Sequence, residues 1–294
     1  MTERLADIDA RIDGVRQLGA VVNAMRGVAA ARAQQARNQL AAVDAYAQTI
    51  AAAMGRALDF EAADPSSVAP RPTRPALLVF TAEQGFAGAF SERVFDTLNT
   101  RSGSYSGPAE GADAAQPEVF LIGTRGSAVA ASRGVSVAWQ AAMPSHSSAI
   151  PKLAERVVQA LYARIAIGAI DTLDVISSQW QPGHGVHVRR QRLFPVDFSL
   201  FPRPENAERP LLNLAPSGLV VALAEDYLYA EICRAALHAF AAENEARMEA
   251  MAAARHQVDQ RLAALQATQR RVRQDEITAE IIELAAGATA AARC

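Results

Sequence analysis

Residues 219–286 contain neither glycine nor proline, and most of them are strong helix formers. One unbroken helix over this stretch would be about 100 Å long, several times the diameter of a small domain. Apolar or small residues recur every three or four positions from Leu237 to Val272, and the pattern resumes with a shifted phase from Ile277 to Ala288. This spacing predicts a coiled-coil helix with one stutter, and such a helix needs a partner along much of its length.

The first 58 residues supply that partner. Apolar and small residues alternate at spacings of three and four from Leu5 to Ala57, and Arg26 is the one charged residue at a seam position. Many seam positions are alanine or glycine, so the two helices can approach closely, with less apolar burial per residue. We expect helices over residues 3–58 and 219–290 to form an antiparallel coiled coil, because a compact module between them would return the chain to its starting point.

The middle of the chain has a different period. Residues 59–75 form a proline-rich linker, and residues 199–218 form a second linker before the long C-terminal helix. Between them, residues 76–198 are expected to form a small Rossmann-like α/β module with a partly parallel sheet. Its predicted strands are 76–81, 119–122, 135–139, 172–179 and 186–195, and its predicted helices are 88–100, 127–132 and 150–167. The predicted fold class is therefore α/β, with this module inserted into the coiled coil.

Composition and charge exclude several classes of protein. The formal net charge of −2 gives no basic excess for nucleic acid. No run of about 20 uncharged apolar residues could span a bilayer, and charges interrupt the first residues, so we expect neither a membrane helix nor a secretory signal. The two cysteines, Cys233 and Cys294, indicate neither a disulfide framework nor a zinc site.

No constellation of residues indicates an active site. Residues 85–88 (GFAG) lack the spacing and the Lys-Ser/Thr pair of a phosphate-binding loop, and residues 122–126 (IGTRG) suit an ordinary strand-to-helix turn. His184 and His187 flank a turn without a nearby cysteine or carboxylate that would complete a metal site. We therefore expect no catalytic residue, no cofactor and no metal.

Both ends of the chain carry family signatures. Residues 11–15 (RIDGV) and 23–32 (NAMRGVAAAR) resemble the N-terminal signature of the gamma subunit of F-type ATP synthases, with arginines at the positions of its two lysines. Residues 243–251 (ENEARMEAM) and 273–288 (RQDEITAEIIELAAGA) are similar to its two C-terminal motifs. Because the order and spacing agree from end to end, the resemblance covers the whole chain.

Several positions depart from the family pattern. Residues 81–91 keep the two outer glycines of the family's glycine-rich segment but lose its aspartate and cysteine, and Gln269-Arg270 replaces the usual Tyr-Asn. Arg255 and Gln257 replace the family's Thr and Asn. These departures indicate a divergent member, as in an accessory or ion-specialised branch such as the sodium-translocating type.

The resemblance implies a central-stalk rotor that couples H⁺ or Na⁺ translocation to rotary catalysis and is not itself catalytic. The helix pair would stand inside a ring of alternating alpha and beta subunits, and the module would contact the epsilon subunit and the membrane c-ring. The complex would lie on the cytoplasmic face of a bacterial plasma membrane, with the chain peripheral. The residues expected to contact the catalytic ring are Met25, Arg26, Arg273, Gln274, Thr278, Glu280 and Ile281.

Two other classes of protein also fit long helices around an α/β module. One is a coiled-coil scaffold, which accounts for the helices but not for Arg273, Gln274 and Thr278 at the family's spacing. The other is a small α/β enzyme with helical dimerisation arms, for which the sequence offers no site. Co-purification with nucleotide-binding alpha and beta subunits would distinguish all three.

Overall fold

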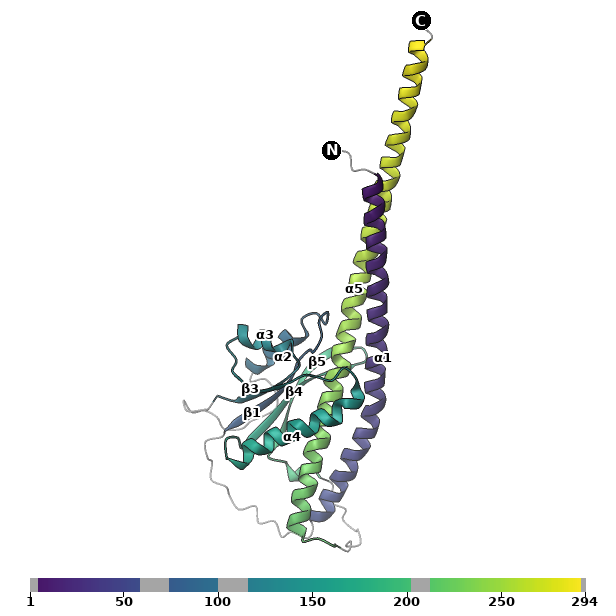
Figure 1. Cartoon of the computed structure of the whole chain (residues 1–294). Helices are drawn as coiled ribbons and strands as arrows, with labels where there is room; N and C mark the ends of the chain where they lie inside the picture. The colour runs from purple at the N-terminus through teal and green to yellow at the C-terminus, as the bar shows by residue number, and fades with distance from the viewer. Residues whose placement is uncertain (1–4, 59–73, 100–115, 202–211, 292–294) are drawn as a thin grey trace. The chain divides into compact units, whose positions relative to one another are not determined.

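The computed structural model describes residues 5–58, 74–99, 116–201 and 212–291, and a long helix lies at each end of this chain (Figure 1). The contacts divide the chain into unit 1, residues 1–28 with 248–294, and unit 2, residues 29–247. The elements in chain order are α1 (Leu5–Leu58), β1 (Pro75–Phe80), α2 (Phe90–Asn99), β2 (Glu118–Ile122), α3 (Gly126–Ser132), β3 (Val137–Ala141), η1 (Ser147–Ala149), α4 (Ile150–Ala166), β4 (Thr172–Gln181), β5 (Gly185–Phe194), η2 (Phe198–Leu200) and α5 (Pro216–Ala291).

Unit 1 is a two-helix coiled coil of α1 and α5. Ile8, Ile12 and Leu265 form its buried apolar cluster. Farther along, Gly19 faces Val258, which is itself buried. Residue numbers rise along α1 as they fall along α5, so the helices are antiparallel, as the sequence predicted.

The seam of α1 differs from the prediction at one position. Val22 and Ala29 are buried, Met25 is half-buried and Arg26 is exposed. The seam therefore advances by three residues and then four, through Met25, whereas the predicted phase placed Arg26 in it. Exposure of the guanidinium avoids the large cost of burying an unpaired charge.

Unit 2 contains a five-stranded mixed sheet in the order β3-β2-β1-β4-β5. Strand β1 pairs in parallel with β2 and β4, and β2 pairs in parallel with β3. The last strand, β5, is antiparallel to β4 because a short turn joins the two. The partly parallel sheet predicted from the sequence is confirmed.

Alternate residues of the strands face two apolar layers. Leu78 and Phe120 belong to the larger cluster, with apolar residues of α4 and α5 and Ala36 of α1. Leu77 and Val119 face the other way, toward α2 and α3. The sheet is thus buried on both faces, which explains why β1 and β2 are near-continuous apolar runs.

Strand β3 begins two residues later than predicted. Gly134 has a φ of 67°. The N–H of Val135 donates to the Ala130 carbonyl at 2.9 Å. Gly134 and Val135 cap the C-terminal end of α3 and therefore do not pair with β2, so the strand starts at Val137.

Parts of the predicted segmentation lie outside the described residues. The linker at 59–75 is described only from residue 74, and the linker at 199–218 only at its two ends. The domain boundaries therefore stay a prediction, although α5 itself begins at Pro216. None of the described helices combines the length and apolar character that crossing a membrane requires.

Replacing Gly19 by leucine is expected to destabilise unit 1. A Cβ atom at position 19 would lie 3.2 Å from Cγ1 of Val258, so a larger side chain would force the helices apart at a cost of about 1–3 kcal/mol. Gly27→Leu is the matched control, because a Cβ there meets nothing within 4 Å and leucine improves helix propensity. Thermal unfolding followed by circular dichroism should show a lower Tm for Gly19→Leu only, and equal values would contradict the close helix contact.

Candidate functional site

The predicted contact residues form two separate groups in unit 1. Met25 and Arg26 lie on α1, whereas Arg273, Gln274, Thr278, Glu280 and Ile281 lie near the end of α5. The structure does not bring the groups together: Asp9 of α1 bonds Gln269, and Gly19 lies against Val258. With α1 and α5 antiparallel, Met25 lies beside a part of α5 well before Arg273.

The second group is solvent-exposed. Arg273, Gln274, Thr278, Glu280 and Ile281 are all exposed. The Thr278 hydroxyl donates to the carbonyl of Gln274 at 2.8 Å, inside its own helix. Its oxygen can therefore still accept a hydrogen bond, but its proton is already used. The Arg273 guanidinium and the Gln274 amide remain as hydrogen-bond donors for another chain.

The apolar seam does not resume within the chain as the sequence predicted. Ile277, Ile281 and Leu284 are 50%, 60% and 74% exposed, respectively. The apolar cluster of unit 1 extends only as far as Val272 on α5 and includes Ile8 near the start of α1. The described part of α1 begins at Leu5, less than one turn from Ile8, so α1 ends near this point and Ile277, Ile281 and Leu284 form an exposed apolar face.

A buried polar network in unit 2 was missed by sequence reasoning. The Glu243 carboxylate of α5 accepts hydrogen bonds at 3.1 Å from the backbone N–H groups of Glu83 and Gln84, and it pairs with Arg247. Arg247 also donates to the Gly85 carbonyl at 3.1 Å. Glu243 and Arg247 are 3% and 4% exposed. Two residues of the ENEAR segment on α5, Glu243 and Arg247, therefore fix the loop that follows β1 through hydrogen bonds to its backbone.

The Glu83 side chain fills the carboxyl edge of the sheet. It accepts hydrogen bonds from the backbone N–H groups of Thr124 at 3.1 Å and Met143 at 2.9 Å, and from the Thr124 hydroxyl at 3.0 Å. In doubly wound sheets this edge is where backbone N–H groups meet the phosphates of a ligand. Here a carboxylate of the chain occupies those donors, which leaves them unavailable to a nucleotide.

The loop after β2 is a tight turn, as its sequence predicts. Gly123 has a φ of 101°, and a Cβ there would collide with the carbonyl of Thr81. Only glycine fits this conformation at this distance from β1.

No metal site emerges from the residues that the structure describes. They contain no group of three or more histidine, cysteine, aspartate or glutamate side chains that could hold a metal ion. His184 is exposed and His187 is half-buried on β5.

Removing the Glu243 carboxylate should cost more stability than removing an exposed one. Glu243→Ala would leave the Arg247 guanidinium buried without its carboxylate, and breaking a buried pair in this way costs about 3–5 kcal/mol. Asp13→Ala is the control, because Asp13 pairs with Arg16 at 3.1 Å on the surface. Urea unfolding monitored by circular dichroism should separate the two variants, and an equal loss in both would show that the network adds no stability.

Comparisons with known proteins agree with these features. A family model described as ATP synthase matches residues 4–291. The ATP synthase gamma chain of Frankia casuarinae is 25% identical over 301 residues, which cover 99% of each chain. That of Streptomyces griseus is 28% identical over 298 residues, covering 96% of this chain and 94% of the relative.

Solved structures show the same fold at low identity. A chain of the Euglena gracilis mitochondrial ATP synthase rotor superimposes with a TM-score of 0.62 at 11% identity, covering 93% of this chain and 98% of that one. A chain of the Tetrahymena thermophila mitochondrial ATP synthase central stalk and c-ring superimposes with a TM-score of 0.55 at 18% identity. The match covers 80% of this chain and 99% of that one. With a family model that matches nearly every residue, the chain belongs to the ATP synthase gamma-chain family.

Proposed function

We propose that this chain is the rotor shaft of an F-type ATP synthase and turns inside a ring of alpha and beta subunits. As a member of the gamma-chain family it is a non-catalytic central-stalk subunit. The observation that carries the proposal is the uncovered face of Ile277, Ile281 and Leu284, on a helix whose preceding seam is paired. Exposed apolar side chains that lie together mark a surface for another chain.

The apolar face and the polar residues beside it suit a rotating contact. Ile277 and Ile281 offer a surface without fixed hydrogen bonds, which suits a bearing. Arg273 and Gln274 offer donors that can meet carboxylates at one rotary angle, through charge-assisted bonds of roughly 1.5–3 kcal/mol. Different side chains on different sides of the shaft would hold the surrounding subunits in different conformations, because differential contact shifts their populations.

The remaining assignments rest on the family. Subunits of an ATP synthase are the partners of a gamma chain, and we propose that they include epsilon and the membrane c-ring, both at the α/β module. The chain is peripheral to the membrane, and we propose the cytoplasmic face of a bacterial plasma membrane. Translocation would supply about 2.3 kcal/mol per charge per 100 mV. The assignment to a sodium-translocating branch stays a prediction.

Replacing Arg273 and Gln274 together by alanine should slow ATP hydrolysis without destabilising the isolated chain. Both side chains are exposed, so the Tm of the isolated chain should stay the same, whereas the complex rebuilt with alpha and beta subunits should turn over more slowly. The matched control is Arg156→Ala with Gln159→Ala, an exposed arginine and glutamine on α4. Equal turnover in both rebuilt complexes would show that the two residues at the end of α5 make no contact that matters for rotation.

Arg26→Ala tests the first group of contact residues. Because the guanidinium is exposed and lies outside the seam, the substitution should leave the Tm of the chain within error. It should lower the ATP formed per ion translocated in reconstituted vesicles if Arg26 meets a carboxylate of the ring. Arg16→Ala, which removes an exposed arginine from the same helix, is the control for loss of charge. Unchanged coupling per assembled complex would leave Arg26 as a solvated surface residue.

A further inference from the structure

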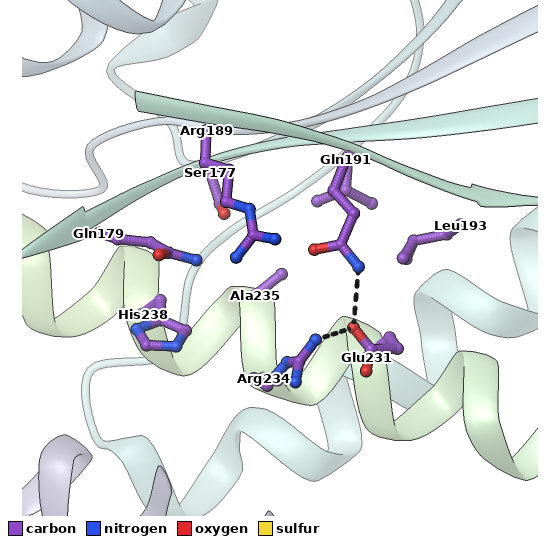
Figure 2. A pocket seen from close by; sticks show the side chains of 10 residues that line it. Ser177, Gln179, Arg189, Gln191, Leu193, Glu231, Arg234, Ala235 and His238 are labelled. Carbon is purple, nitrogen blue, oxygen red and sulfur yellow. Dashed lines mark hydrogen bonds and ion pairs between the residues drawn. The ribbon is translucent and has the colours of Figure 1, made fainter. Parts of the chain in front are cut away.

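A polar pocket lies in unit 2 between the sheet and α5 (Figure 2). Its cavity is small, about 20 Å³, and it opens to solvent. The sheet contributes three residues each from β4 and β5, and α5 contributes four. The ten lining residues are Val175, Ser177, Gln179, Arg189, Gln191, Leu193, Glu231, Arg234, Ala235 and His238.

The pocket is built by regular structure rather than by a loop. Ser177 of β4 is paired with Arg189 of β5, and both line the pocket. On α5, Glu231, Arg234 and His238 are three and four residues apart, so they share one face of the helix. Secondary structure on both sides therefore fixes where the polar groups point.

Hydrogen-bond donors outnumber acceptors in this pocket. The buried Glu231 carboxylate accepts from the Gln191 amide at 3.3 Å and from the Arg234 guanidinium. The Arg189 guanidinium has no hydrogen bond or ion pair with any residue that the structure describes, and Figure 2 shows it directed into the space above α5. His238 likewise makes no hydrogen bond within the described part of the chain. A group that fills this space has to accept hydrogen bonds.

We propose that this pocket binds a small tetrahedral oxyanion, such as sulfate or inorganic phosphate. Such an ion only accepts hydrogen bonds when fully ionised, and the planar guanidinium of Arg189 presents a fork of donors that matches two of its oxygens. The Arg234 guanidinium and the His238 ring face the same space from α5. The proposal does not depend on the rotor function.

The surrounding charges set the expected pH dependence. Three titratable groups lie near Glu231 and Arg234. Asp44 is 3.9 Å from Arg234, and Tyr227 is hydrogen-bonded to Glu231. The third, His187, interacts electrostatically with His238. Burial, followed by the Arg234 charge, lowers the pKa of His238 below its ordinary value. A bound anion would favour the imidazolium form and raise this pKa. Binding should therefore tighten as the pH falls from above the raised pKa of the bound state toward the lowered pKa of the free state.

Calorimetric titration of the full chain with sodium sulfate tests the proposal. Sulfate keeps a constant charge across this pH range, and sodium chloride at the same ionic strength serves as the blank. We expect saturable binding that is tighter at pH 6 than at pH 8, with a shift of the His238 imidazole signals in NMR spectra. Inorganic phosphate should bind to the same site and compete with sulfate.

Arg189→Ala is the decisive variant, because Arg189 is exposed and its loss should leave the fold intact. We expect sulfate binding about tenfold weaker or more in Arg189→Ala. Arg156→Ala removes the same charge from an exposed position on α4 and should bind as the unchanged chain does. The assignment fails if sulfate gives only the linear response of chloride, or if both variants lose affinity equally. It also fails if acidic peptides saturate the site and the free ions do not, because the pocket would then receive a protein side chain.

Discussion

The apolar side of the 76-residue helix α5 has to be covered by other parts of the chain, and the rest of the fold depends on this requirement. In unit 1 the cover is the first half of α1, which packs along α5 up to Val272. In unit 2 the sheet and the second half of α1 share the task, with Leu237 and Phe240 of α5 in the same cluster as Leu78. Only the last turns lack cover among the described residues. The α/β module is therefore as much a packing surface for α5 as a domain of its own.

The apolar contacts alone fix the register of the two helices weakly. Ala29, Ala33 and Ala36 occupy successive seam positions of α1, and a shift of one turn along such small side chains would change little buried area. Polar contacts fix the position of α5 against the α/β module more strongly. If α5 slid by one turn past the loop after β1, Glu243 and Arg247 would lose their backbone partners while still buried, which costs far more than a displaced alanine.

The local features of the fold could be predicted from the sequence because they depend on periodicity. The seam positions up to Val272, the order of strands and helices, and the β4–β5 turn all follow from residue spacing. The predicted seam was one residue out of phase at Arg26, β3 begins two residues later than predicted, and the seam expected from Ile277 onward is exposed. The Glu243 network depends on pairing with a loop about 160 positions earlier in the chain, and no local pattern encodes such a contact. The one available signal was a run of charges inside the motif ENEAR, on a stretch of α5 that proves buried from residue 241 to 247.

The carboxyl edge of the sheet has its backbone N–H groups occupied by carboxylates of the chain itself. In a doubly wound sheet the N–H groups beyond the strand ends are the feature that attracts phosphate. In this chain Glu83 bonds the N–H groups of Thr124 and Met143, and Glu243 bonds those of Glu83 and Gln84. Two carboxylates thus provide internally the negative charge that a ligand would bring, and the second of them belongs to α5. The edge that binds ligands in other proteins here attaches the sheet to the long helix, which is what a torque-bearing subunit requires.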